Sequence, residues 1–251
     1  MGATVCRAVA GDSSLDLAAG VDPFHSGLEL SRVADVTGVD VQVSADPSAF
    51  ADAGVQVVVD FTEASAARRN LLWAAANGIH AVVGTSGFSE EDLDGFAAAF
   101  TRSNCVIAPN FAIGAVLMIR FAELAAPYFE TVEIIELHHD AKVDAPSGTA
   151  MHTAERIAAA SGEWAPDPTT SVVSEGARGA KSPAGIPIHS VRMRGMVAHQ
   201  EVILGTTGQT LVLRHDSIDR TSFMPGVLLA IKAVADHPGV TVGLDSLLGL
   251  G

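Results

Sequence analysis

The segment Val55-Gln-Val-Val-Val-Asp-Phe-Thr62 sets the structural class of this chain, because its nearly continuous β-branched run predicts a strand covered on both faces, as parallel strands are. Similar runs alternate with alanine-rich stretches of helical period through the first half. They lie at residues 15–21, 39–43, 79–84 and 105–108, with helices expected at 65–77 and 90–100. Ser89 and Asp92 resemble a capping box before the second helix. The alternation predicts an α/β domain with a Rossmann-like, doubly wound parallel sheet.

The pattern changes after Tyr128, where strand-like segments crowd together with one clear helix among them, at residues 149–160. Strands are expected at 132–138, 186–193, 199–204 and 210–214, and a polar loop region at 163–185. Gly205-Thr-Thr-Gly208 predicts a hairpin loop that makes the last two strands antiparallel neighbours. We therefore expect an α+β domain with an open mixed sheet, which a partner subunit would cover. A helix at 221–235 is expected to pack back on the first domain.

Composition excludes several classes of protein. Hydrophobic residues make up 48% and charged residues 18% of the 251 residues, as in a soluble globular protein. Cys6 and Cys105 have no CxxC pairing and no histidine at zinc spacing, so we expect no disulfide framework, no structural metal and a cytoplasmic location. No apolar stretch reaches the roughly eighteen residues of a membrane span. The net charge of −14 argues against nucleic acid, which needs a basic surface.

Reactive side chains are densest in Glu136-Leu-His-His-Asp-Ala-Lys-Val-Asp-Ala-Pro-Ser-Gly-Thr-Ala150, between a predicted strand and a predicted helix. Ser147 is a good N-cap, so the amides of Gly148 and Thr149 would form an anion site suited to a carboxylate. His138, His139 and Lys142 lie just upstream and could add an acid or base and a fixed cation.

Two other interpretations of this stretch compete with a catalytic one. Adjacent strand residues point to opposite faces, so a His-His pair can be a surface or a buried structural pair. A metal site is the more specific alternative to a catalytic cluster. However, the HExxH spacing is absent, and Asp140 and Asp144 make an incomplete ligand set. The residues alone leave the catalytic and structural interpretations equally open.

The same stretch resembles the signature of the dihydrodipicolinate reductases, whose pattern of Glu, His-His, Lys and Asp-Ala-Pro-Ser-Gly-Thr-Ala it matches at every fixed position. Further segments agree in order and spacing: Val59-Asp-Phe-Thr62, Gly84-Thr-Ser-Gly-Phe88, Ala108-Pro-Asn-Phe111 and the segment 195–201. The resemblance extends from Gly2 to the C-terminus. It is greatest to actinobacterial members at His215-Asp-Ser-Ile-Asp-Arg-Thr-Ser-Phe223.

This resemblance implies reduction of 4-hydroxy-tetrahydrodipicolinate to tetrahydrodipicolinate with NADH or NADPH, with loss of water, in diaminopimelate and lysine biosynthesis. It implies that His138 is the acid/base residue and Lys142 the proton donor. It also implies that His139, Gly148 and Thr149 hold the substrate dicarboxylate, and that the protein is a homotetramer. Residues 1–112 and 219–251 would form the dinucleotide-binding domain, and residues 113–218 the substrate-binding and oligomerisation domain.

Cofactor contacts carry over from the resemblance to residues that follow predicted strands. They are Asp22, Gly84, Thr85, Ser86, Ala108, Pro109, Asn110 and Phe111. Ser86 stands where the family has Thr and keeps the hydroxyl. Asp22 would bond a ribose hydroxyl, although a lone Asp after a strand is more often a turn residue. The next residues, Pro23 and Phe24, include no arginine for a 2′-phosphate, which favours NADH or dual use.

The N-terminus departs from the family pattern. Family members begin with a strand and a Gly-x-x-Gly-x-x-Gly loop, whereas this chain begins at the last of those glycines, Gly2. We therefore expect the first strand and most of the phosphate loop to be absent, as in a truncated gene model or a fragment. This gap supports an alternative function, a non-catalytic or defective homologue that keeps the oligomerisation domain. The complete signature around His138 opposes it.

Overall fold

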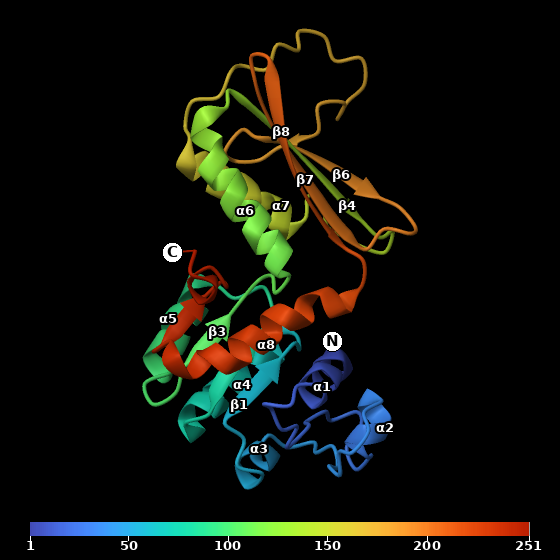
Figure 1. The fold of residues 1–251 in the computed structure, drawn as a ribbon, viewed down its shortest axis with the longest axis vertical. Coiled ribbons are helices and arrows are strands. Elements are labelled where there is room, and N and C mark those ends of the chain that lie inside the picture. The colour runs from blue at the N-terminus through green and yellow to red at the C-terminus, as the bar shows by residue number, and fades with distance from the viewer. Residues whose placement is uncertain (251) are drawn as a thin grey trace. The chain divides into compact units, whose positions relative to one another are not determined.

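The computed structural model describes residues 1–250, which fold into two compact units (Figure 1). The first unit combines Met1–Phe111 with Arg220–Gly251, and the second is Ala112–Asp219. The chain therefore leaves the first unit once, builds the second from one continuous segment, and returns. Within residues 1–250, no helix combines the length and the apolar character that crossing a membrane requires.

The first unit is built on a four-stranded parallel sheet with the order β1-β2-β3-β9. Its strands are β1 (Val57–Asp60), β2 (His80–Val83), β3 (Cys105–Ile107) and β9 (Val240–Val242). All three residues of β3 and the last three of β2 are buried, which is why these strands read as continuous apolar runs. The predicted parallel sheet is confirmed, although β9 is a strand that the sequence pattern did not indicate.

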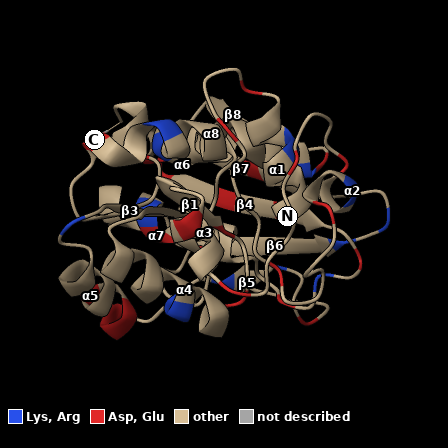
Figure 2. Cartoon of the chain, turned by 90° about the horizontal axis from the view of Figure 1, so that it is seen from below, with Lys and Arg blue, Asp and Glu red and all other residues tan. Residues whose placement is uncertain are grey.

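Helices cover both faces of this sheet (Figure 1). The helices α4 (Ala64–Asn77) and α5 (Glu90–Ala99) share one apolar core with alternate residues of β2 and β3. On the other face α8 (Met224–Ala233) packs on β2. Ser89 and Asp92 form the predicted capping box at the start of α5, where the acidic first turn, visible in Figure 2, also suits the helix dipole.

Two predicted strands in the first unit are wrong. Residues 15–21 and 39–43 form no ladder, and their only pairings are isolated bridges, Val21 with Ser44 and Glu29 with Gln42. β-branched residues favour extended backbone, but a strand also needs a hydrogen-bonded neighbour along its length. The short helices α1 (Gly2–Ala10), α2 (Leu30–Ala34) and α3 (Ser48–Asp52) lie around these segments.

The predicted helix at 221–235 is divided into three parts. A 3₁₀ turn, η2 (Arg220–Phe223), precedes α8, and a second, η3 (Val234–Asp236), follows it. Pro225 in the first turn of α8 explains the first division, because proline fits the start of a helix and lacks the N–H that a helix interior needs.

The second unit is a five-stranded mixed sheet with the order β5-β6-β4-β7-β8. Its strands are β4 (Thr131–His138), β5 (Ala180–Lys181), β6 (Pro187–Arg192), β7 (Ala198–Thr206) and β8 (Gln209–Ser217). β4 and β6 run parallel, and the other neighbours are antiparallel. The predicted hairpin is confirmed: Thr206 pairs with Gln209, and Gly208 takes the positive φ of 82° that the tight turn requires.

One face of this mixed sheet carries the core of the second unit. The helices α6 (Ile113–Ala125) and α7 (Gly148–Ala160) pack on it, together with the 3₁₀ turn η1 (Ala126–Tyr128) (Figure 1). Burial alternates along β4, with Val132, Ile134 and Glu136 buried and the residues between them half-buried. The alternation follows from the two-residue period of a strand with one covered face.

Gly226 of α8 provides a test of this packing. A Cβ added there would lie 2.1 Å from the carbonyl oxygen of Phe111, whereas one added at Gly95 of α5 would meet nothing within 4 Å. We expect Gly226→Ala to lower the free energy of unfolding by about 1–3 kcal/mol, the cost of overpacking. Gly95→Ala should raise it by about 0.5–1 kcal/mol, because alanine is the better helix former. Urea unfolding of both variants measures this, and a Gly226→Ala protein as stable as the parent would contradict the packing.

Candidate active site

The signature stretch begins at the end of β4, and His138 is the last residue of that strand. His139 therefore lies outside the strand, so the alternation of side chains along β4 no longer separates the two histidines. The His138 side chain is largely buried, while His139 is exposed. The backbone carbonyl of His138 accepts from the N–H of Met193, which continues the parallel pairing with β6.

Glu136 is fully buried behind these histidines, and its partners include Arg192, His138 and Ser147. Arg192 donates Nη1 to Oε2 at 2.7 Å and Nη2 to Oε1 at 2.8 Å, a bidentate pair. His138 Nδ1 lies 2.6 Å from Oε2, and the backbone N–H of Ser147 donates to Oε1 at 3.2 Å. We call these four residues the Glu136 cluster.

The electrostatics of the Glu136 cluster favour an ionised carboxylate. Burial by itself would raise the pKa of Glu136, but hydrogen bonds from His138, Arg192 and Ser190 lower the pKa to about 2. The same carboxylate raises the pKa of Arg192. At neutral pH the cluster therefore holds a buried negative charge that is paired with a fixed guanidinium.

A loop from His139 to Pro146 carries Lys142 past this cluster. The Lys142 ammonium contacts both carboxylate oxygens of Asp144 at 2.8 Å, and this ion pair lowers the pKa of Asp144. Arg192 Nη2 also donates to the backbone carbonyl of Asp144 at 2.6 Å. Arg192 thus ties the lysine-bearing loop to the buried carboxylate.

The start of α7 completes the region. Ser147 is the N-cap, and its hydroxyl accepts from the N–H of Ala150 at 3.2 Å. Gly148 is exposed and Thr149 half-buried, and first-turn amides have no acceptor within their own helix. A cis peptide joins Ala145 to Pro146 just before this cap. His138 therefore contacts Glu136 directly, Gly148 and Thr149 follow its partner Ser147, and Lys142 is linked to it only through Asp144 and Arg192. His139 is exposed beyond the end of β4.

The predicted cofactor residues of the first unit follow neighbouring parallel strands. Gly84, Thr85 and Ser86 come directly after β2, and Ala108 to Phe111 come directly after β3, so both groups lie at the carboxyl edge of the sheet. The Ala108 N–H donates to Val83 at 2.9 Å, and the Thr85 hydroxyl donates to the carbonyl of Thr62 at 2.9 Å.

Gly84 is sterically required at this edge. A Cβ there would lie 2.0 Å from the ring of Phe61, whose centroid is 5.6 Å from that of Phe111. The two aromatic rings and the glycine therefore form one packed surface after β1, β2 and β3.

Asp22 has local partners. Its carboxylate accepts from the N–H of Phe24 at 2.9 Å and contacts Nδ1 of His25 at 2.7 Å. Burial opposes the charge, but these hydrogen bonds leave the pKa of Asp22 below its usual range. This is the geometry of an Asx turn, so a ribose hydroxyl would have to share the carboxylate with them.

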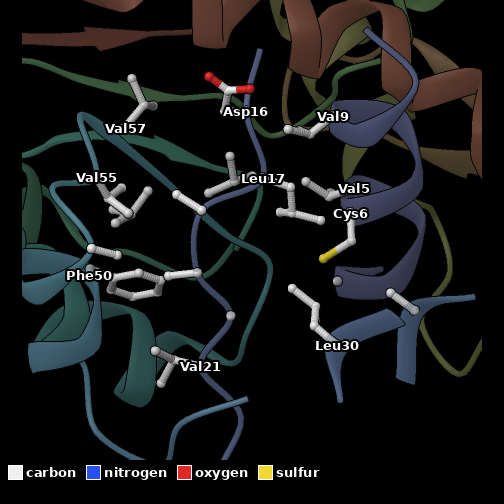
Figure 3. A pocket seen from close by; sticks show the side chains of 18 of the residues that line it. Val5, Cys6, Val9, Asp16, Leu17, Val21, Leu30, Phe50, Val55 and Val57 are labelled. Atoms are coloured by element: carbon white, nitrogen blue, oxygen red, sulfur yellow. The ribbon is translucent and has the colours of Figure 1, made fainter. Parts of the chain in front are cut away.

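A pocket of about 520 Å³ lies beside α1 in the first unit, and of the predicted cofactor residues Asp22 lines it (Figure 3). Apolar side chains face into it, among them Val5, Val9, Leu17, Leu30 and Val57. Its described lining residues include no Lys or Arg, and the acids Asp16 and Asp22 would repel a phosphate. Pocket size therefore does not locate the chemistry here. Within residues 1–250, no three His, Cys, Asp or Glu side chains are placed to hold a metal ion.

Sequence reasoning missed the role of two residues in this region. Glu136 is part of the signature and lies two residues before His138 on the same strand. Residues two apart on a strand point to the same face, so the sequence alone could have predicted a contact between their side chains. Arg192 had no such signal, because it lies 56 residues from Glu136 and meets it only through the pairing of β4 with β6.

Comparisons with known proteins agree over both units. Residues 1–111 match the family description "Dihydrodipicolinate reductase, N-terminus", and residues 114–248 match "Dihydrodipicolinate reductase, C-terminus". The 4-hydroxy-tetrahydrodipicolinate reductase of Mycolicibacterium vanbaalenii is 56% identical over 218 residues, 85% of this chain and 88% of that relative. The enzyme of the same name from Mycobacterium ulcerans is 51% identical over 227 residues, 88% and 92% of the two chains.

Solved structures extend the comparison. A dipicolinate-bound dihydrodipicolinate reductase from a Paenisporosarcina species has a TM-score of 0.84 and 39% identity, and the match covers 97% of this chain and 93% of that one. An amine dehydrogenase from Mycobacterium smegmatis, at a TM-score of 0.64 and 14% identity, covers 96% and 92% and shares the fold alone.

The two-unit fold, with its polar loops at the carboxyl edge of a parallel sheet, and the relatives at 39–56% identity together identify a nicotinamide-nucleotide-dependent oxidoreductase. The chain belongs to the dihydrodipicolinate reductase family, whose members use NADH or NADPH.

The two serine N-caps test whether the start of α7 belongs to the active site. Ser147 caps α7, and Ser89 caps α5 in the other unit. We expect Ser147→Ala and Ser89→Ala each to lose roughly 0.5–2 kcal/mol of stability. Only Ser147→Ala should also lower kcat/KM for reductase turnover per folded molecule. Thermal melts and steady-state rates of both variants decide this, and equal losses of turnover would remove α7 from the site.

Proposed function

We propose that this protein reduces 4-hydroxy-tetrahydrodipicolinate to tetrahydrodipicolinate in diaminopimelate and lysine biosynthesis. The observation that carries the proposal is the complete family signature from Glu136 to Ala150, folded so that His138 and the cap of α7 bind one buried carboxylate, to which Arg192 ties the loop that carries Lys142. A relative at 39% identity was solved with dipicolinate bound, which supports a planar dicarboxylate as the ligand class. A defective homologue would have no need to keep every side chain of this cluster.

His138 and Lys142 are the proposed catalytic residues. The net reaction adds one hydride and one proton to the ring and releases one water. Release of hydroxide needs a proton, which Lys142 donates from its ammonium. His138 exchanges a proton with the ring through its Nε2, because its Nδ1 is held by Glu136. The reaction therefore needs one donor and one acid/base group near the ring, and the chain supplies both.

His139, Gly148 and Thr149 are the proposed substrate-binding residues. The first-turn amides of α7 point out of the helix and favour a carboxylate there, and the N-terminal dipole adds to the attraction. Exposed His139 can donate to the second carboxylate. Binding of a dianion to a chain of net charge −14 requires such local donors.

NADH or NADPH would occupy the carboxyl edge of the parallel sheet, where Gly84, Thr85, Ser86 and the segment Ala108, Pro109, Asn110 and Phe111 gather. The residues fit a nicotinamide nucleotide, because they lie at the carboxyl edge of the sheet and exposed Ser86 offers a hydroxyl, whereas the buried Thr85 hydroxyl donates to Thr62 and supports the loop. When bound, the nicotinamide supplies the hydride. Asp22 is proposed for the ribose, in competition with its turn partners.

The half-buried face of the mixed sheet is the proposed subunit contact. It carries Val212 of β8, which is half exposed, beside Ile203 of β7. Burial of such a face by copies of the chain would remove its apolar surface from solvent. We propose a homotetramer that works in the cytoplasm.

Replacing the catalytic side chains should remove turnover without unfolding the protein. We expect His138→Gln and Lys142→Ala to lower kcat by at least about 100-fold, the usual scale of acid–base catalysis, with melting temperatures close to the parent. His152→Gln on α7 and Lys181→Ala on β5 are matched controls, because both residues are exposed and lie outside the signature. An early-melting His138→Gln protein with full turnover per folded molecule would favour a structural histidine pair.

Pyridine-2,6-dicarboxylate should inhibit by competing with the ring substrate. Its two carboxylates match the α7 amides at one end and His139 with Lys142 at the other. Pyridine-2-carboxylate, which has one carboxylate, should bind more weakly. Steady-state inhibition patterns test both compounds. A fully active enzyme that millimolar pyridine-2,6-dicarboxylate does not inhibit would count against this substrate class.

A further inference from the structure

The shortest contact of the Glu136 cluster joins its buried acid to the proposed catalytic histidine. Glu136 and His138 are two residues apart on β4, so both side chains lie on the face covered by α7. The carboxylate is fully buried and lies 2.6 Å from Nδ1 of His138. The catalytic roles given above leave Glu136 and Arg192 without a function.

We propose that Glu136 is a positioning residue for the reductase reaction: it holds the proton of His138 on Nδ1 and so presents Nε2 to the substrate. Arg192 holds the Glu136 carboxylate in the orientation that this requires. The inference rests on the proposed function, because it assigns a purpose to Nε2 of His138.

The chemistry of the two groups supports this assignment. An ionised carboxylate can only accept hydrogen bonds, so the nitrogen that contacts it must donate. With a pKa near 2, Glu136 is ionised throughout the neutral range, and Nδ1 of neutral His138 carries the hydrogen. Nε2 is then the unprotonated nitrogen and can accept a proton from the ring or return one.

The surroundings of His138 contain few other charges that could set its protonation. Arg192 faces it from β6, and Lys142 and Asp144 follow in the loop, where they pair with each other. His199 on β7 lies beside Leu137 on the opposite face and contacts Asp216. Glu136 is therefore the acid in direct contact with the His138 ring.

Glu136 also couples His138 to the rest of the site. Its Oε1 accepts from the N–H of Ser147, the cap of α7, and from Arg192, which in turn binds the carbonyl of Asp144. A change at Glu136 would therefore disturb the histidine, the helix start and the lysine loop together. The test must separate the effect on protonation from this structural effect.

Glu133 provides a matched control on the same strand. It too contacts one arginine and one histidine: Arg178, and His189 at 2.7 Å. It lies on the opposite face of β4, and none of its partners belongs to the candidate site. Glu133→Gln removes the same charge from an arginine–histidine cluster on the same strand without touching His138, although the Glu133 side chain is half-buried and that of Glu136 is fully buried.

The decisive experiment compares Glu136→Gln with Glu133→Gln. Glutamine keeps an acceptor for Nδ1 but removes the charge that favours the protonated imidazole. We expect Glu136→Gln to lower kcat/KM by about 10- to 100-fold, the range found when the outer hydrogen-bond partner of a metal-binding histidine is changed. The pH–rate profile of Glu136→Gln should differ from that of the parent. Glu133→Gln should keep the parent rate and profile. A Glu136→Gln enzyme with the parent profile, or one that only melts earlier, would overturn the proposal.

A second variant guards against a misfolded Glu136→Gln protein. Glu136→Leu combined with Arg192→Met removes both buried charges and leaves neither unpaired, a kind of change that proteins often tolerate. Nitrogen NMR of labelled histidine, with His138 assigned from His138→Gln, should show Nδ1–H in the parent and a tautomer mixture in the double variant. A parent with hydrogen on Nε2 would overturn the proposal. The NMR measurement needs no substrate, so it tests the role of Glu136 independently of the reaction. A parent protein without reductase turnover would refute the proposed function, and the tautomer of His138 would still show whether Glu136 holds the proton on Nδ1.

Discussion

The buried ion pair between Glu136 and Arg192 is the interaction on which the candidate site depends. It joins β4 to β6, and the carboxylate also binds His138 and the first amide before α7. Removing one partner of such a pair leaves an uncompensated charge and commonly costs about 3–5 kcal/mol. The cluster therefore tolerates little local change, and the side chains around it keep fixed positions. The two carboxylate oxygens of Glu136 thus connect β4, the start of α7 and, through Arg192, the loop that carries Lys142.

Both units place their polar groups at the ends of strands for the same physical reason. Strand interiors in this chain are buried on at least one face, and unpaired polar groups there would cost free energy. Where a strand ends, the backbone turns outward, and loops can present side chains and helix amides to a ligand. β4 ends at His138 in the second unit, and β2 and β3 end at the glycine and proline loops of the first. The 520 Å³ pocket beside α1 is lined mainly by apolar side chains, and its described lining residues include no Lys or Arg, so its size is a poor guide to function.

Charge balance limits how the site can bind an anion. The chain has a net charge of −14, and the cations Arg192 and Lys142 already have acidic partners, Glu136 and Asp144. Attraction of a dicarboxylate thus depends on His139, on the α7 amides and on exchange of Lys142 between Asp144 and the ligand. The Lys142–Asp144 pair is half exposed and worth little, so this exchange is inexpensive, whereas the buried Arg192 pair is not available for it.

Local patterns were enough for much of this protein. Continuous apolar runs identified β1, β2 and β3, a Ser–Asp spacing identified the start of α5, and two glycines identified the hairpin between β7 and β8. The signature from Glu136 to Ala150 indicated the site, because its residues are neighbours in the chain. Residues 15–21 and 39–43 were wrongly predicted as strands, since a strand depends on a neighbour that the segment itself cannot specify. The pairing of Glu136 with Arg192 was likewise decided only by the tertiary structure, because their contact across 56 residues exists only once β4 and β6 lie side by side.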